Sequence, residues 1–130
     1  MNNKKVLVVE DDDISQFLIR KMLESYNIDV NVVSNGLEAL ENLSSNEYDV
    51  ILMDIEMPVI SGYETIRRLK NGDFSEQVKS TPIIGISANP FDHEEHVYLE
   101  HGMDAYISKP ISPEQLEHKI SSLIRSKKTS

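Results

Sequence analysis

The 130-residue chain contains no cysteine, which excludes disulfide bonds and thiolate metal sites. It also lacks a run of roughly 20 apolar residues, the length that a transmembrane helix needs. Its first residues, MNNKK, do not include the apolar stretch of a signal peptide. The sequence therefore predicts a soluble cytoplasmic protein that makes no contact with a membrane.

Basic residues are scarce, since 13 lysines and arginines stand against 22 aspartates and glutamates for a formal net charge of −9. A chain this acidic is repelled by phosphate backbones, so we expect no nucleic acid as a partner. The hydrophobic share of 39% is typical of a globular protein that can bury one core without disulfides. We expect a single domain over residues 1–130, with an ordered core of about residues 4–125.

Short apolar runs alternate with longer amphipathic segments along the chain. The predicted strands are 6–9, 28–33, 50–53, 82–86 and 105–107, and the predicted helices are 14–25, 37–43, 63–70, 91–101 and one that begins at 113. This alternation predicts an α/β fold of (βα)₅ type, in which helices cover both faces of a parallel sheet. The connection 71–81 is unusually long, and residues 126–130 are expected to fray.

Two of the predicted helices carry clear apolar stripes. The apolar stripe of helix 14–25 consists of Ile14, Phe17, Leu18 and Met22. The inward stripe of the last helix consists of Leu116, Ile120, Leu123 and Ile124. Ser112 is expected to cap that last helix, with Pro113 at its first position.

Polar side chains follow four of the predicted strands, at the point where each strand ends. Glu10 and Asp11 follow the first strand, and Asp54 follows the third. Ser87 follows the fourth strand and Lys109 the fifth. Ligands of open parallel sheets bind beyond the carboxyl ends of the strands, so we expect these five side chains to meet at one edge.

This set of groups has a chemical logic. Clustered carboxylates repel one another, and Mg²⁺ (or Mn²⁺) relieves the repulsion while leaving room for a phosphate oxygen. Asp54 can then act as a nucleophile that forms an acyl phosphate, with Ser87 and Lys109 binding phosphoryl oxygens. Taken singly, each residue has a simpler role, such as the helix capping that we expect of Asp12 and Asp13. Taken together, they predict a phosphoryl-transfer site.

Five stretches carry a resemblance to a known family. They are VLVVEDD (6–12), NGLEAL (35–40), DVILMDIEMPVISGYE (49–64), PIIGISAN (82–89) and GMDAYISKP (102–110). The chain resembles the response-regulator receiver domain, the CheY-like fold of the chemotaxis response regulator. This resemblance implies a flavodoxin-like, doubly wound, five-stranded sheet of order 2-1-3-4-5. It also implies a cis peptide bond between Lys109 and Pro110.

The resemblance assigns a metal site to four residues. Asp54 is similar to the aspartate that is phosphorylated and also ligates Mg²⁺. Asp11 corresponds to a second direct ligand, and Glu10 to an acid that acts through water. The backbone carbonyl of Glu56 is expected to complete the protein ligands.

The resemblance also implies a switch. Ser87 and Lys109 look like the family's hydroxyl and lysine, and Tyr106 looks like the aromatic that turns inward when the hydroxyl moves toward the phosphate. This movement is expected to change the surface made by residues 91–101, 105–107 and the last helix (the α4-β5-α5 surface of the family).

Glu56 and Asn89 occupy the two variable positions that flank the phosphate, and we expect both to tune its lifetime. The sign of the Glu56 effect is open at this point, because its charge can repel the phosphoryl group or orient an attacking water. The chain departs from the common family pattern at two positions, with Ser61 where Asp is frequent and Ser87 where Thr is frequent.

A receiver of this kind takes its phosphoryl group from a sensor histidine kinase or a histidine phosphotransfer protein and signals to a downstream protein. It is not an enzyme in the conventional sense, since it phosphorylates itself from the donor and dephosphorylates slowly. The 71–81 connection and the GMDAYISKPI segment look most like receivers of hybrid histidine kinases or free-standing relatives. A single-domain relay protein is the preferred interpretation.

Other classes of protein are alternatives. A haloacid-dehalogenase-type phosphatase also uses a strand-end aspartate with Mg²⁺, and sustained turnover of a small phosphoester would favour it. An interaction module that has lost phosphorylation would be favoured if no acyl phosphate formed on Asp54. A flavodoxin-like cofactor binder shares the fold, but acids after its first strand would repel a flavin phosphate.

Overall fold

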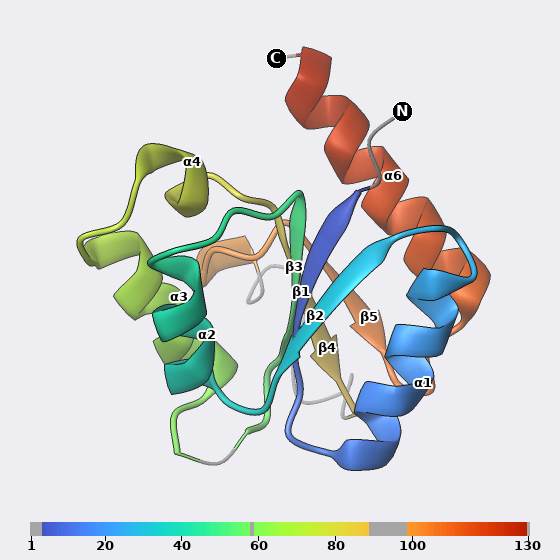
Figure 1. The fold of residues 1–130 in the computed structure, drawn as a ribbon. Coiled ribbons are helices and arrows are strands. Elements are labelled where there is room, and N and C mark those ends of the chain that lie inside the picture. Colours follow the sequence, from blue (N-terminus) through green and yellow to red (C-terminus); the bar gives the residue numbers. More distant parts are fainter. Residues whose placement is uncertain (1–3, 58, 89–98, 130) are drawn as a thin grey trace.

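Five parallel strands form the centre of the protein, in the order β2-β1-β3-β4-β5 that the resemblance implies (Figure 1). The computed structural model describes residues 4–57, 59–88 and 99–129. The strands are β1 (Lys5–Val9), β2 (Asp29–Val33), β3 (Val50–Asp54), β4 (Ile83–Ser87) and β5 (Ala105–Ser108). The helices are α1 (Asp13–Glu24), α2 (Gly36–Leu43), α3 (Gly62–Asn71), α4 (Glu76–Lys79) and α6 (Pro113–Thr129). Most of the helix predicted at 91–101 lies outside the described residues.

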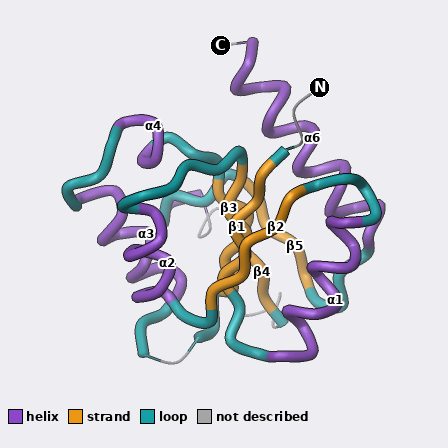
Figure 2. Tube along the Cα trace, viewed as in Figure 1, coloured by secondary structure: helices purple, strands orange, loops and turns teal. Residues whose placement is uncertain are grey.

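Helices cover both faces of the sheet, as predicted. Figure 2 shows α1 and α6 on one face and α2, α3 and α4 on the other. Under α1 and α6, the core consists of apolar residues such as Ile19, Leu23, Leu116 and Ile120. Under α2 and α3, it includes Ala39, Leu43, Ile66 and Leu69. The central strands β3 and β4 are buried along their whole length, which explains why their sequences are almost continuously apolar.

Helix α1 forms where predicted, but it does not bury its most apolar stripe. The buried residues of the helix are Ile19 and Leu23. In contrast, Ile14, Phe17 and Leu18 are 70%, 58% and 49% exposed. Ile19 and Leu23 pack against side chains of β1 and β3, and this packing sets the rotation of the helix on the sheet. The apolar stripe predicted from the sequence therefore faces largely outward.

The long connection 71–81 contains a short helix, α4, that the sequence analysis missed. Ser75 caps it, because its side chain accepts a hydrogen bond from the Val78 backbone N–H at 3.1 Å. Val78 is buried in the core and anchors the connection. Helix α6 is longer than predicted, since its backbone continues to Thr129. None of the helices in the described part of the chain is long and apolar enough to span a membrane.

The loop after β3 closes tightly on the end of that strand. The Gly62 backbone N–H donates to the carbonyl of Ile55 at 3.0 Å. A Cβ on Gly62 would lie 2.6 Å from the carbonyl oxygen of Asp54, so only glycine allows this approach. The same loop holds Val59 at a φ of 73°, a left-handed conformation that is strained for a β-branched residue.

The strain at Val59 predicts that Val59→Asn stabilises the protein. Asparagine tolerates the left-handed region better than valine, and the Val59 side chain is 71% exposed, so little packing is lost. We expect the free energy of unfolding to rise by up to about 1 kcal/mol in urea unfolding. Val59→Thr keeps the branched Cβ and serves as the matched control with little change. Equal stability of the Asn and Thr variants would contradict strain at this position.

Candidate functional site

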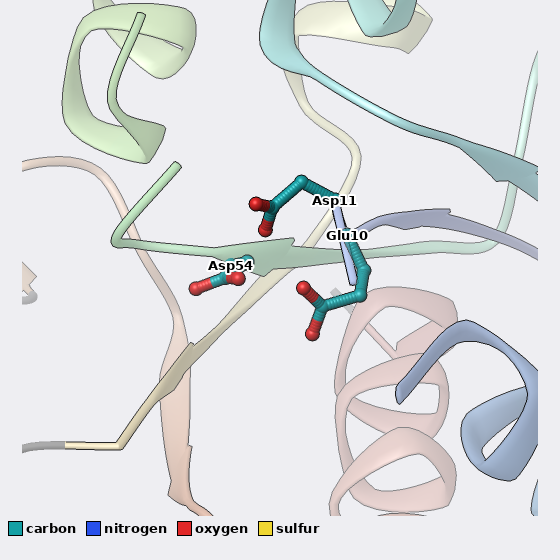
Figure 3. A group of neighbouring side chains, drawn as sticks. All are labelled: Glu10, Asp11 and Asp54. Atoms are coloured by element: carbon teal, nitrogen blue, oxygen red, sulfur yellow. The ribbon is translucent and has the colours of Figure 1, made fainter. Parts of the chain in front are cut away.

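Three carboxylates lie together at the carboxyl edge of the sheet, as predicted (Figure 3). Glu10, Asp11 and Asp54 each offer an oxygen, and these oxygens lie within 4.8 Å of one another. Strands β1 and β3 are neighbours, with Val9 paired to Met53, so the residues after this pair, Glu10 and Asp54, come side by side. Asp12 stays out of the cluster and caps α1, because its side chain accepts from the Ser15 backbone N–H.

Lys109 brings a positive charge to the same edge. Its Nζ lies 2.9 Å from Oε1 of Glu10 and 3.8 Å from Oδ2 of Asp54. Its backbone N–H donates to the carbonyl of Ser87 at 2.9 Å, which continues the pairing of β4 with β5 up to the site. The Lys109–Pro110 peptide bond is cis, as the resemblance implies.

Two of the three carboxylates are withdrawn from water. Glu10 is fully buried, and its Oε2 accepts from the backbone N–H of Asp12 at 3.2 Å. Asp54 is 3% exposed, and its Oδ1 accepts from the backbone N–H of Glu56 at 3.1 Å. Asp11 is exposed and lies at the mouth of the cluster. The site therefore has a buried floor and one acid that reaches solvent.

The carboxylates compete for a single ammonium group. Burial, the hydrogen bond with Glu10 and the charge of Glu10 raise the pKa of Asp54 to about 8, although Lys109 acts in the opposite direction. Burial also opposes ionisation of Glu10, but its hydrogen bonds with Asp54 and Lys109 outweigh that effect and lower its pKa. Burial and the neighbouring Glu10 raise the pKa of Asp11. An additional cation would favour the charged forms of Asp11 and Asp54.

Ser87 is fully buried at the end of β4, and its hydroxyl donates to Oε1 of Glu56 at 2.8 Å. Both residues are predicted from the sequence to lie at the site, but their hydrogen bond is not, because residue spacing carries no signal for it. Tyr106 is partly buried and packs against the core cluster that includes Met53. Asn89, the second residue expected to tune the phosphate lifetime, lies outside the described residues.

The sequence matches the response regulator receiver domain family over residues 6–121, and the chain belongs to this family. The polar-differentiation response regulator DivK of Brucella anthropi is 37% identical over 109 residues, which cover 84% of this chain and 86% of DivK. Hybrid signal transduction histidine kinase I of Dictyostelium discoideum is 36% identical over 126 residues, which cover 93% of this chain. The chain spans only 7% of the length of that kinase.

A solved structure supports the same assignment. The receiver domain of the sensor histidine kinase PA1611 from Pseudomonas aeruginosa superimposes with a TM-score of 0.85 and 31% identity, covering 95% of this chain and 98% of that domain. That structure has a magnesium ion coordinated in its active site cleft. The chain is therefore a receiver domain of two-component signalling, which disfavours the phosphatase, cofactor-binding and degenerate-module alternatives.

The raised pKa of Asp54 predicts that stability falls with pH when divalent cations are chelated. An unfolded aspartate has a pKa of about 4, so between pH 4 and 8 the folded state keeps a proton that the unfolded state has lost. The free energy of unfolding should therefore fall over this range, by up to about 5 kcal/mol at about 1.4 kcal/mol per pH unit. Asp54→Asn should remove most of the loss and be more stable than wild type at pH 8.

Urea unfolding in EDTA from pH 5 to pH 9 measures this effect. Asp13→Asn removes an exposed acid at the same edge and should keep the wild-type pH dependence. If the free energy of unfolding of Asp54→Asn fell with pH as steeply as that of wild type, a group other than Asp54 would hold the proton.

Proposed function

We propose that the chain accepts a phosphoryl group on Asp54 in a two-component system or phosphorelay. The observation that carries this proposal is a buried aspartate at the end of the central strand, with two further carboxylates and an ammonium group around it. Burying acids without enough counter-charge lowers the stability of the fold, so their presence at one edge calls for a chemical reason. Transfer of a phosphoryl group in the presence of a cation supplies that reason.

In the proposed reaction, an oxygen of Asp54 attacks the phosphorus of a phosphohistidine donor. The P–O bond forms as the P–N bond breaks, and the imidazole leaves with the electron pair. Lys109, whose Nζ is 3.8 Å from Asp54, neutralises charge on the phosphoryl oxygens, and the Ser87 hydroxyl donates to one of them. Each transfer converts Asp54 to an acyl phosphate, and slow hydrolysis of that acyl phosphate restores the free aspartate. Because the chain is itself the phosphorylated product, it is not an enzyme in the conventional sense.

Mg²⁺, or Mn²⁺ in its place, fits the donor set of the site. All three acids offer oxygen ligands, which hard divalent cations prefer, and these oxygens lie within 4.8 Å of one another. Asp11 and Asp54 would bind the ion directly, Glu10 through water, and Glu56 through its backbone carbonyl. When bound, the ion neutralises charge on the phosphoryl oxygens and favours the ionised form of Asp54.

We propose that the donor is a sensor histidine kinase or a histidine phosphotransfer protein that docks on α1. Ile14, Phe17 and Leu18 expose apolar surface on this helix, and such patches typically mark protein interaction sites. A cavity of about 220 Å³ beside it is lined by residues that include Leu18, Met22, Lys109, Pro110 and Ile111. Because Lys109 belongs to both the cavity and the acceptor site, a partner seated there brings its phosphohistidine close to Asp54.

We further propose that a downstream protein reads the phosphorylated state. The Ser87 hydroxyl would move toward the phosphoryl group, and Tyr106 would turn further inward against the core. Such a movement changes the surface around β5 and α6. The chain would act in the cytoplasm, where the ATP that supplies phosphohistidine is made.

The nucleophile is tested by labelling with acetyl phosphate and Mg²⁺. The wild-type chain should take up a hydroxylamine-sensitive label, whereas Asp54→Asn should lose it by at least about 100-fold because no other carboxylate replaces the acceptor. Chelation with EDTA should abolish labelling of the wild type, since the clustered charges then repel the phosphoryl group. Asp49→Asn, at the opposite end of β3, is the control and should label fully. An undiminished label on Asp54→Asn would refute the assignment.

The docking surface is tested with a phosphorylated histidine phosphotransfer protein that labels the wild-type chain. Replacing both Phe17 and Leu18 by Ser should slow transfer from this protein at least about tenfold, because the apolar contact is lost. Labelling by acetyl phosphate should stay within about twofold of wild type, since the small donor needs no docking. Tyr26→Ser removes a 40% exposed aromatic beyond the far end of α1 and should change neither rate. Unchanged protein-to-protein transfer in the double variant would exclude α1 as the docking surface.

A further inference from the structure

The hydroxyl of Ser87 is held by a side chain that the phosphoryl-transfer chemistry does not require. Ser87 is fully buried, and its Oγ donates to Oε1 of Glu56 at 2.8 Å. Glu56 follows Asp54 by two residues, and its backbone N–H donates to Oδ1 of Asp54 at 3.1 Å. Glu56 therefore contacts both the acceptor carboxylate and the hydroxyl.

The hydrogen bond to Glu56 and the one required after phosphorylation are alternatives. A serine hydroxyl has one proton to donate. In the unphosphorylated protein that proton points to the Glu56 carboxylate, and in the proposed phosphorylated state it points to a phosphoryl oxygen on Asp54. Both acceptors are oxygens of an anionic group, so both form charge-assisted hydrogen bonds and compete on similar terms.

We propose that Glu56 is a positioning residue that holds the Ser87 hydroxyl in the unphosphorylated protein and thereby opposes the switch. We call this hydrogen bond the Glu56–Ser87 latch. After phosphorylation, the Ser87 hydroxyl has to turn from Glu56 to the phosphoryl group and donate its hydrogen bond there. Only then can Tyr106 and β5 respond. The latch rests on the proposed function, because it regulates the same acceptor site. The latch predicts the direction in which the Glu56 carboxylate acts on the switch. Removing the carboxylate favours the phosphorylated arrangement.

Glu56 opposes a phosphoryl group on Asp54 in two ways that can be separated. Its negative charge repels the phosphoryl group whatever residue stands at position 87. The latch acts only when residue 87 carries a hydroxyl. A Ser87→Ala background therefore removes the latch and leaves the repulsion, so a double-mutant comparison isolates the latch.

The experiment measures binding of beryllofluoride, a phosphoryl mimic, with Mg²⁺ by ¹⁹F NMR. Glu56→Ala should tighten binding about tenfold in the wild-type background, but no more than about threefold in Ser87→Ala. Glu56→Gln loses the charge but keeps a carbonyl acceptor, so it should give an intermediate gain. Asp13→Ala removes another exposed acid at the same edge and should change binding less than about twofold in either background.

A second measurement examines the variants without metal or mimic and uses the beryllofluoride-bound wild-type spectrum only as the reference. Release of the latch should shift the resting equilibrium, so amide NMR signals of β5, including that of Tyr106, should move part of the way toward their beryllofluoride-bound positions in Glu56→Ala. They should not move in this direction when Ser87→Ala is combined with Glu56→Ala. Because the Glu56 side chain is exposed, its replacement should leave the thermal unfolding midpoint close to that of wild type.

The two measurements separate the latch from the function on which it rests. Equal tightening by Glu56→Ala in both backgrounds, or β5 signals that stay in place in Glu56→Ala, would overturn the latch alone. A wild-type chain that binds no beryllofluoride and takes no label from acetyl phosphate would overturn the phosphoacceptor function, and the latch with it.

Discussion

One ammonium group faces three carboxylates at the carboxyl edge of the sheet, and the properties of the site follow from this imbalance. Burial and the neighbouring Glu10 raise the pKa of Asp54 to about 8, because Lys109, which lies closer to Glu10, only partly offsets them. The acids stay close together because they lie at the ends of β1 and β3, which are paired neighbours at the centre of a sheet covered on both faces. This edge therefore answers its excess negative charge with a raised pKa at Asp54, and its three oxygen donors form a group that could hold a metal ion.

Much of this edge could be predicted from the sequence, because a parallel sheet brings the residues after its strands to one side. The acids after the first and third strands meet because β1 and β3 are neighbours, and that adjacency came from the family resemblance rather than from the residues. Side-chain direction could not be predicted in the same way. The hydrogen bond between Ser87 and Glu56 joins residues 31 positions apart and depends on the rotamer of an exposed glutamate.

The same limit applies to α1. Helical periodicity indicates which residues share a face, but it does not indicate which face packs on the sheet when several are apolar. Ile19 and Leu23 fill the space over β1 and β3, so Phe17 and Leu18 remain outside. The short helix α4 was missed for a different reason, because one turn is too short for periodicity to appear and only the Ser75 cap marks it.

The contact between Glu10 and Lys109 spans 99 positions of the chain. During synthesis residue 10 leaves the ribosome long before residue 109, and the strands before β5 can begin to pack in the meantime. Until β5 has joined β4, Lys109 is not held beside the carboxylates at the sheet edge. A nascent chain, or one cut before β5, therefore lacks the Lys109 contact with Glu10 and Asp54. The pairing of the C-terminal strand therefore decides when Lys109 joins the three carboxylates at this edge.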